Sequence, residues 1–181
     1  MTDDQLYCAY LSGDQTAGDQ LMLRYSDTLT AYLDAFLHNP QDAEDLMLDC
    51  FTVILVNRPA IREGNFRAYL FRVARNKVSR FWKMRLRQPE FVPDEDLPVQ
   101  ADPREDVFTG SERSIIISKC LGRVAPQYRE ALWLFYYMGM NYVQAAAVLG
   151  CSRKKIDNLL RNGRNRLRLE LEKEGITRAD I

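Results

Sequence analysis

The basic residues from Ser152 to Arg168 carry the clearest chemistry in this sequence, which is the binding of phosphate groups and base edges. The stretch holds seven Lys or Arg residues and one acid, Asp157, a net charge of +6. Ile156 and Leu160 lie four residues apart within it. The spacing predicts a helix with an apolar stripe on one side and cations on its other faces.

The residues before this helix predict a tight turn that would place it. Asn141 can cap a short helix with Gln144 completing a capping box, and Gly150 permits the left-handed backbone that ends this helix. Ser152 can then cap the basic helix, and the small residues Ala145–Ala147 allow the two helices a close approach. The pattern favours a helix-turn-helix whose second helix enters a DNA major groove. The alternative is an ordinary helical hairpin with a solvated basic face.

Composition excludes several classes of protein. The 181 residues have no net charge and 46% hydrophobic content, and no apolar run approaches the 18 residues of a membrane span. No secretory leader is seen, and no carboxylate cluster, catalytic triad or phosphate-binding glycine loop appears. The single histidine, His38, has no cysteine near it, and the four cysteines are far apart. We expect a soluble, cytoplasmic protein that is not an enzyme and has no metal, no cofactor and no membrane insertion.

Charge is distributed in blocks of opposite sign. Residues 1–50 carry ten acids and one base, and residues 89–112 carry eight acids and one base. Residues 67–87 carry eight Lys or Arg and no acid. A binding partner meets these local fields rather than the neutral sum.

Strand signals are scarce, so the chain is expected to be all-α. Residues 88–112 hold four prolines among their acids, which predicts a linker between two small helical domains, 1–87 and 113–181. The second domain is expected to be a four-helix helix-turn-helix unit. Helices are expected over residues 3–12, 16–37, 42–56, 65–87, 114–124, 126–138, 142–149 and 153–171.

Apolar spacing predicts which helix faces are buried. The inward residues of the later helices are expected to be Phe66, Tyr69, Leu70, Val73, Ala74, Val78, Ile116, Ile117, Cys120, Leu121, Val124, Ala131, Leu132, Phe135 and Met138. The helix over 42–56 is apolar on one face, and its other face presents Asp42, Glu44, Asp45 and Asp49. That acidic face is either simply solvated or a docking surface for a basic partner. In the helix over 65–87, Phe81 and Trp82 lie among cations, a mixture that suits single-stranded or opened nucleic acid if these rings are not core residues.

Three segments together resemble a known family. DAEDLMLDCF, FRAYLFRVARNKVSRFWKMRLR and APQYREALWLFYYMGMNYVQAAAVLGCSRKKIDNLLRNGRNRLR occur in this order. The chain resembles the small two-domain group of sigma-70-type RNA polymerase sigma factors, the extracytoplasmic-function group, over nearly its whole length. The resemblance implies a region 2-like domain (1–87) for polymerase docking and −10 recognition, an acidic linker (88–112), and a region 4-like domain (113–181) for −35 recognition.

The resemblance also implies the partners. It predicts a subunit of RNA polymerase that contacts the β′ clamp helices and the β flap of the core enzyme, binds promoter DNA, and is held by an anti-sigma factor. The polymerase-docking residues would be Asp42, Glu44, Asp45, Leu48 and Asp49, with Leu48 standing where many relatives have Gln. The alternative is a free-standing helix-turn-helix regulator that acts without being a polymerase subunit.

The DNA-binding residues follow from the same resemblance. The loop Asn57–Asn65 would capture a flipped −10 base, and the −10 residues would be Asn57, Arg58, Arg62, Asn65, Arg67, Asn76, Lys77, Arg80 and Trp82. The −35 residues would be Arg153, Lys155, Asp157, Asn158, Arg161, Asn162, Arg164 and Arg166, the last two mostly on phosphate. Asp157 and Leu159 depart from the Lys or Arg common in relatives, so the −35 sequence cannot be transferred from the usual members.

Overall fold

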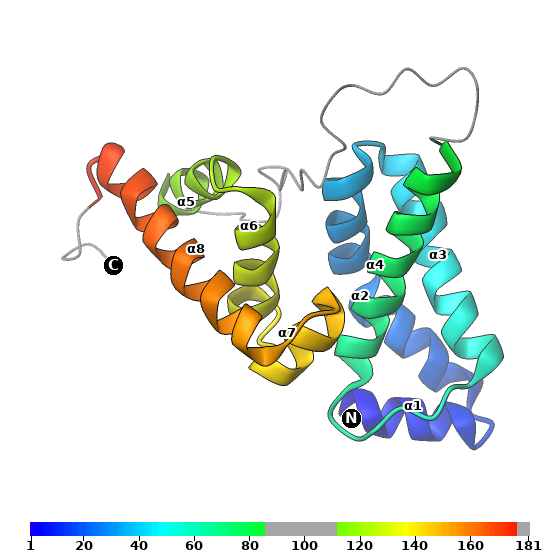
Figure 1. Cartoon of the computed structure of the whole chain (residues 1–181). Helices are drawn as coiled ribbons and strands as arrows, with labels where there is room; N and C mark the ends of the chain where they lie inside the picture. The colour runs from blue at the N-terminus through cyan, green and yellow to red at the C-terminus, as the bar shows by residue number, and fades with distance from the viewer. Residues whose placement is uncertain (86–111, 177–181) are drawn as a thin grey trace. The chain divides into compact units, whose positions relative to one another are not determined.

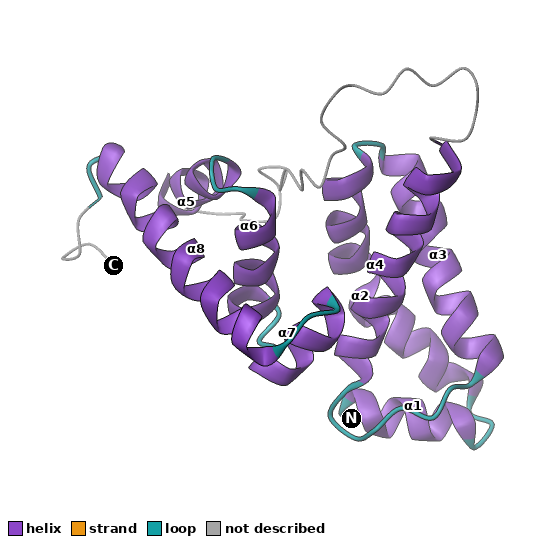
Figure 2. Ribbon diagram, in the orientation of Figure 1, coloured by secondary structure: helices purple, strands orange, loops and turns teal. Residues whose placement is uncertain are grey.

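The fold is helical throughout the described part of the chain. The computed structural model describes residues 1–85 and 112–176, and every regular element within them is a helix (Figures 1 and 2). The chain divides into two compact units, Met1–Asp96 and Leu97–Ile181. The predicted all-α class with two small helical domains is therefore confirmed. Apart from Glu112, the expected linker 88–112 lies outside the described residues, and the domain boundaries named above stay predictions.

The first unit is built from four helices around one core. They are α1 (Asp3–Leu11), α2 (Gln15–Leu37), α3 (Pro40–Asn57) and α4 (Phe66–Arg85). α2, α3 and α4 pack against one another, and α1 lies across one end of them, in contact with α2 and α4 (Figure 1). The core contains fully buried Leu29, Leu33, Phe51, Phe66 and Phe71.

The junction between α2 and α3 is a tight reversal. His38 ends α2 in the left-handed conformation (φ 52°), as a helix C-terminal residue, the position expected for it. Asn39 Oδ1 accepts hydrogen bonds from the backbone N–H groups of Gln41 and Asp42 at 3.0 and 3.3 Å. α3 therefore begins at Pro40, two residues before the predicted start, because proline is well suited to the first turn of a helix.

The buried face of α4 differs in part from the predicted stripe. Ala68 and Phe71 are buried, whereas Tyr69 and Val73, which were expected to be buried, lie at the edge of the core. The reason is that α4 packs against α1, α2 and α3. Contacts on more than one side bury a broader and rotated face than a single apolar stripe predicts.

The second unit places one long helix against shorter ones. Its elements are α5 (Glu112–Gly122), α6 (Pro126–Leu132), a π-helical segment (Trp133–Tyr137), α7 (Tyr142–Leu149) and α8 (Arg153–Lys173). α8 packs against α5, α6 and α7 (Figure 1). Ile156 and Leu160, the predicted apolar stripe, are 0% and 1% exposed.

Four expected core residues of this unit are not fully buried. Ile117 is 37% exposed, and Ile116, Leu121 and Phe135 are half-buried, whereas Leu134, which was not predicted, is fully buried. The backbone N–H of Met138 donates to the carbonyl of Trp133 at 3.0 Å, five residues back, so the helix widens by one residue here. Leu134 follows the buried Ala131 by three residues and precedes the buried Met138 by four, so it continues the buried face in place of Phe135.

A buried arginine closes the turn between α5 and α6. Arg129 Nη2 donates to the carbonyls of Gly122 (2.7 Å) and Val124 (3.0 Å), and Nε also reaches the Val124 carbonyl at 3.3 Å. Arg129 is only 7% exposed. It satisfies carbonyls at the end of α5 that would otherwise be buried without donors.

Gly163 sets the distance between α8 and α6, and we expect Gly163→Ala to destabilise the second unit. A Cβ at this position would lie 3.1 Å from Leu132 Cγ and 3.3 Å from Tyr128 Cβ, both on α6. Overpacking costs about 1–3 kcal/mol, which exceeds the roughly 1 kcal/mol that alanine gains over glycine within a helix. Chemical denaturation measures the change. Asn165→Ala, on the exposed face of the same helix, is the control and is expected to be neutral or slightly stabilising; equal stability of the two variants would contradict the close contact.

Candidate nucleic-acid interface

The first helix of the helix-turn-helix begins at the predicted cap. Asn141 Oδ1 accepts from the N–H groups of Val143 (2.9 Å) and Gln144 (3.0 Å). Gln144 Oε1 in turn accepts from the Asn141 N–H at 3.0 Å, so the capping box is complete. These reciprocal bonds satisfy N–H groups that have no partner within the helix.

The turn into α8 is fixed by two neighbouring residues. Gly150 ends α7 in the left-handed conformation (φ 62°), and Ser152 Oγ accepts from the Lys155 N–H at 3.2 Å. Both features agree with the sequence analysis. They set the direction in which α8 leaves the turn, and the buried Ile156 and Leu160 set which of its faces points outward.

The outward face of α8 carries most of the predicted −35 residues. Those that are exposed to solvent are Arg153, Lys155, Asp157, Arg161, Asn162, Arg164 and Arg166. Asn158 is half-buried, and its Oδ1 accepts a hydrogen bond of 2.9 Å from Arg161 Nη2. Leu159, which differs from the charged residue of many relatives, is only 9% exposed and so belongs to the packed side of α8.

Several of these arginine side chains contact aromatic residues of neighbouring helical segments. The guanidinium of Arg153 lies 5.8 Å from the ring centre of Tyr142, and that of Arg166 lies 5.4 Å from the ring centre of Tyr128. Arg164 Nη1 donates to the Tyr136 hydroxyl at 3.3 Å. Contacts of this kind restrict the side chains before any ligand binds.

The first unit presents a second polar surface on the loop after α3 and on α4. Of the predicted −10 residues, Asn57, Arg58, Arg62, Asn76 and Arg80 are exposed, and Asn65 is half-buried. Trp82 is half-buried beside Phe81, with the ring centres 5.7 Å apart and the rings nearly perpendicular. The loop after α3 and the outer face of α4 thus carry hydrogen-bond donors and cations, and these two segments follow each other directly in the chain.

Ion pairs connect α4 to the acidic face of α3. Lys77 Nζ lies 3.0 Å from Asp49 Oδ2, and Arg85 Nη1 lies 3.5 Å from Asp42 Oδ2. Two predicted docking residues therefore contact cations of the predicted DNA-binding helix. Along the same face of α3, Glu44, Asp45 and Leu48 are exposed, Leu48 by 48%.

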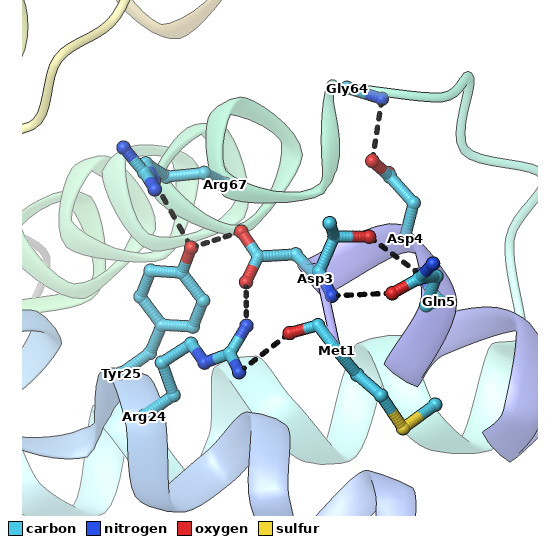
Figure 3. A network of polar contacts seen from close by, with 9 residues as sticks. Met1, Asp3, Asp4, Gln5, Arg24, Tyr25, Gly64 and Arg67 are labelled. Carbon is cyan, nitrogen blue, oxygen red and sulfur yellow. Dashed lines mark hydrogen bonds and ion pairs between the residues drawn. The ribbon is translucent and has the colours of Figure 1, made fainter.

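Arg67 lies in a polar network that the sequence analysis missed. Its Nε donates to the Tyr25 hydroxyl at 3.1 Å, and this hydroxyl donates to Asp3 of α1 (Figure 3). Arg24 pairs with the same carboxylate at 2.6 Å. Burial raises the pKa of Tyr25 to about 12, so its hydroxyl keeps the proton that it donates. The contacts join residues 22 and 42 positions apart, which local spacing does not reveal.

The described residues contain no group of three or more His, Cys, Asp and Glu side chains that could bind a metal ion. Among the described helices, none has both the length and the apolar character needed to cross a bilayer.

A capped helix-turn-helix with a cationic outer helix, and a separate unit in which a basic helix adjoins an acidic one, define a helical DNA-binding transcription protein. The family described as Sigma-70 region 2 matches residues 21–88, and the family described as Sigma-70, region 4 matches residues 114–167. The chain belongs to the sigma-70 family of RNA polymerase sigma factors, in its extracytoplasmic-function group.

Relatives match along most of their length. RNA polymerase sigma factor CnrH of Cupriavidus metallidurans is 30% identical over 175 residues, covering 87% of this chain and 87% of CnrH. RNA polymerase sigma factor SigZ of Bacillus subtilis is 26% identical over 155 residues, covering 85% and 86% of the two chains.

Solved structures agree with these matches. CnrH in complex with the cytosolic domain of CnrY superposes with a TM-score of 0.64 at 25% identity, covering 94% of this chain and 97% of that one. The sigma factor RpoE of Bartonella quintana, in complex with the anti-sigma factor NepR, gives a TM-score of 0.61 at 24% identity, covering 85% and 96%.

Proposed function

We propose that this chain binds core RNA polymerase, directs it to specific promoters and helps to open the −10 region. The observation that carries the proposal is the exposed cationic face of α8 on a fully capped helix-turn-helix, within a chain that matches both region 2 and region 4. In such a subunit, catalysis of RNA synthesis belongs to the core enzyme, and the sigma factor supplies binding and specificity.

The second unit would read the −35 element from the major groove. Arg161 is the best placed base-reading residue, because Asn158 orients its guanidinium at 2.9 Å. Arg164, which donates to the Tyr136 hydroxyl, and Arg166, which lies over the Tyr128 ring, suit phosphate contacts. Such contacts position the helix without specifying a base. Asp157 can accept a hydrogen bond from a cytosine amino group.

The first unit would bind the opened −10 strand. The exposed loop Asn57–Asn65 would receive a base flipped out of the duplex, while Asn76 and Arg80 follow the backbone of that strand. Flipping a base costs a few kcal/mol, which stacking of about 1–3 kcal/mol per base can offset. Arg67 is half-buried against Tyr25, so its part would be to support the start of α4 beside this loop.

The exposed part of the α3 face would dock on the polymerase. Glu44, Asp45 and Leu48 offer an acidic surface with an apolar centre, which suits the β′ clamp helices, and the region 4-like unit would meet the β flap. CnrH was solved with the cytosolic domain of CnrY, and RpoE was solved with the anti-sigma factor NepR; on this basis we infer an anti-sigma partner here as well. These partners would place the protein in the cytoplasm.

Transcription in vitro tests the function directly. Purified protein and core polymerase are mixed with a library of promoter fragments, and the transcripts are sequenced. The sigma role predicts promoter-specific initiation only when both are present, and weak DNA binding by the protein alone. A free-standing regulator would instead bind a specific duplex tightly without polymerase, and lack of stimulation on every fragment would reject the sigma role.

Arg161→Ala is expected to lower discrimination at one or two positions of the −35 element. A bidentate contact from arginine to a base is worth about 1–3 kcal/mol of selectivity. The same transcription library measures the preference at each −35 position. Lys154→Ala, which removes an exposed cation of the same helix outside the predicted base-reading set, is the matched control and should reduce output without changing preference. An unchanged −35 profile in Arg161→Ala would remove this residue from base reading.

A further inference from the structure

Two tyrosines of α1 form hydrogen bonds with backbone carbonyls of the connection between α3 and α4. The Tyr10 hydroxyl donates to the carbonyl of Leu55, in the last turn of α3, at 2.9 Å. The Tyr7 hydroxyl donates to the carbonyl of Pro59 at 2.8 Å. α1 precedes residues 21–88, which match the region 2 family, so these contacts come from outside the matched segment.

The far end of the same loop is held by the start of α1. Asp4 Oδ2 accepts a hydrogen bond of 2.8 Å from the Gly64 backbone N–H (Figure 3). The neighbouring Asp3 accepts from Tyr25, whose hydroxyl also receives Arg67 at the beginning of α4. α1 therefore contacts the last turn of α3 just before the loop through Tyr10, the beginning of the loop through Tyr7, and the end of the loop through Asp4.

The tyrosines that make these contacts are themselves fixed by packing. Tyr7 is 4% exposed, with its ring centre 5.3 Å from that of Phe66, and Tyr10 is 8% exposed. A Cβ on Gly18 of α2 would lie 2.8 Å from the Tyr10 ring, so this ring lies directly against the α2 backbone. Burial raises the pKa of Tyr7 to about 12, which keeps its hydroxyl protonated as a donor.

The hydrogen bonds from α1 go to backbone atoms, and one loop side chain, Arg58, also places its guanidinium 5.3 Å from the ring centre of Tyr10. Asn57, Arg58 and Arg62 are exposed. A loop whose backbone is ordered in advance binds its ligand without a further cost in conformational entropy and tolerates fewer ligand shapes. In this arrangement, α1 packs behind the loop and restricts its backbone to one conformation.

We propose that Asp4, Tyr7 and Tyr10 are positioning residues that fix the loop Asn57–Asn65 and thereby sharpen recognition of the −10 base without touching DNA. The inference rests on the proposed function, in which this loop receives a flipped base. It assigns to α1 a role in promoter selectivity in addition to its part in the fold.

The test uses full-length variants assembled with core polymerase and promoter fragments randomised in both elements. Tyr7→Phe removes one hydroxyl and keeps the packed ring, and Asp4→Ala removes the acceptor for Gly64. Each is expected to weaken the preference at the flipped −10 base by about twofold to tenfold, the factor that one net hydrogen bond is worth, with the −35 preference unchanged. The Gly64 amide should also exchange faster with solvent in Asp4→Ala.

Two matched variants should behave as the unchanged protein does. Asp4→Asn keeps an oxygen that can accept from Gly64, and Ser12→Ala removes a 2.9 Å hydrogen bond to Cys8 at the other end of α1. Unchanged −10 preference in folded Tyr7→Phe and Asp4→Ala overturns the proposal, as do equal losses at −10 and −35. If Asp4→Ala does not fold, Tyr7→Phe decides alone. If the unchanged protein selects no promoter with polymerase, the proposed function itself fails.

Discussion

A double variant, Glu44→Lys with Asp45→Lys, is expected to bind core RNA polymerase at least about tenfold more weakly than the unchanged protein. The reason is that like charges facing each other across an interface cost several kcal/mol. Both acids are exposed on α3 beside Leu48, whereas Asp42 and Asp49 already contact Arg85 and Lys77. The first two therefore carry the charge that remains open to a partner. Titration of labelled protein with core polymerase measures the change.

The control applies the same change in charge on another helix. Asp19→Lys with Asp27→Lys alters two exposed acids of α2, outside the predicted docking surface. Circular dichroism should show intact helices in both double variants. If both bind polymerase equally weakly, net charge rather than the α3 surface controls docking, and if both bind normally, α3 is not the docking helix.

The second large effect concerns stability. Ile156→Ala removes a fully buried side chain from the contact of α8 with the rest of its unit, and it should lower the free energy of unfolding of the second unit by about 2–5 kcal/mol. Ile117→Ala, at a position that is 37% exposed in the same unit, should cost much less. α8, the predicted −35 helix, loses packing contacts in the first variant, so promoter-specific transcription should also fall.

The two tryptophans allow each unit to be followed separately. Trp82 lies in α4 of the first unit, and Trp133 lies in the π-helical segment of the second. Replacing either one by Phe leaves a single fluorescent probe for the other unit during denaturation. Ile156→Ala should shift the transition seen by Trp133 and leave that seen by Trp82 in place. Equal shifts in both would contradict two independent units.

Local sequence patterns predicted the helix-turn-helix well because its determinants lie close together in the chain. The Asn141–Gln144 capping box, the Gly150 turn and the Ser152 cap each depend on residues within four positions of one another. Such contacts form within a single turn of chain and need no information from elsewhere.

Other features are not determined by local spacing. Leu134 rather than Phe135 is buried, and the segment Trp133–Tyr137 contains five consecutive aromatic or aliphatic residues, so no charged position there marks the outer face. The bonds from α1 to the α3–α4 loop join residues 45, 52 and 60 positions apart. Tyr7 and Tyr10 share one side of a short helix, but that spacing alone does not reveal which carbonyls their hydroxyls reach.

The Asp49–Lys77 ion pair has a thermodynamic consequence. If polymerase binds Asp49 as predicted, it would release Lys77 for a phosphate, and assembly with polymerase and capture of the promoter strand would be linked equilibria. Thermodynamic reciprocity would then require that binding of the promoter strand raise the affinity for polymerase by the same factor. Because Asp49 is largely exposed, the factor is small, on the order of fivefold or less. Under these predicted roles, this single surface contact would give the free subunit a lower affinity for nucleic acid than the subunit bound to polymerase has.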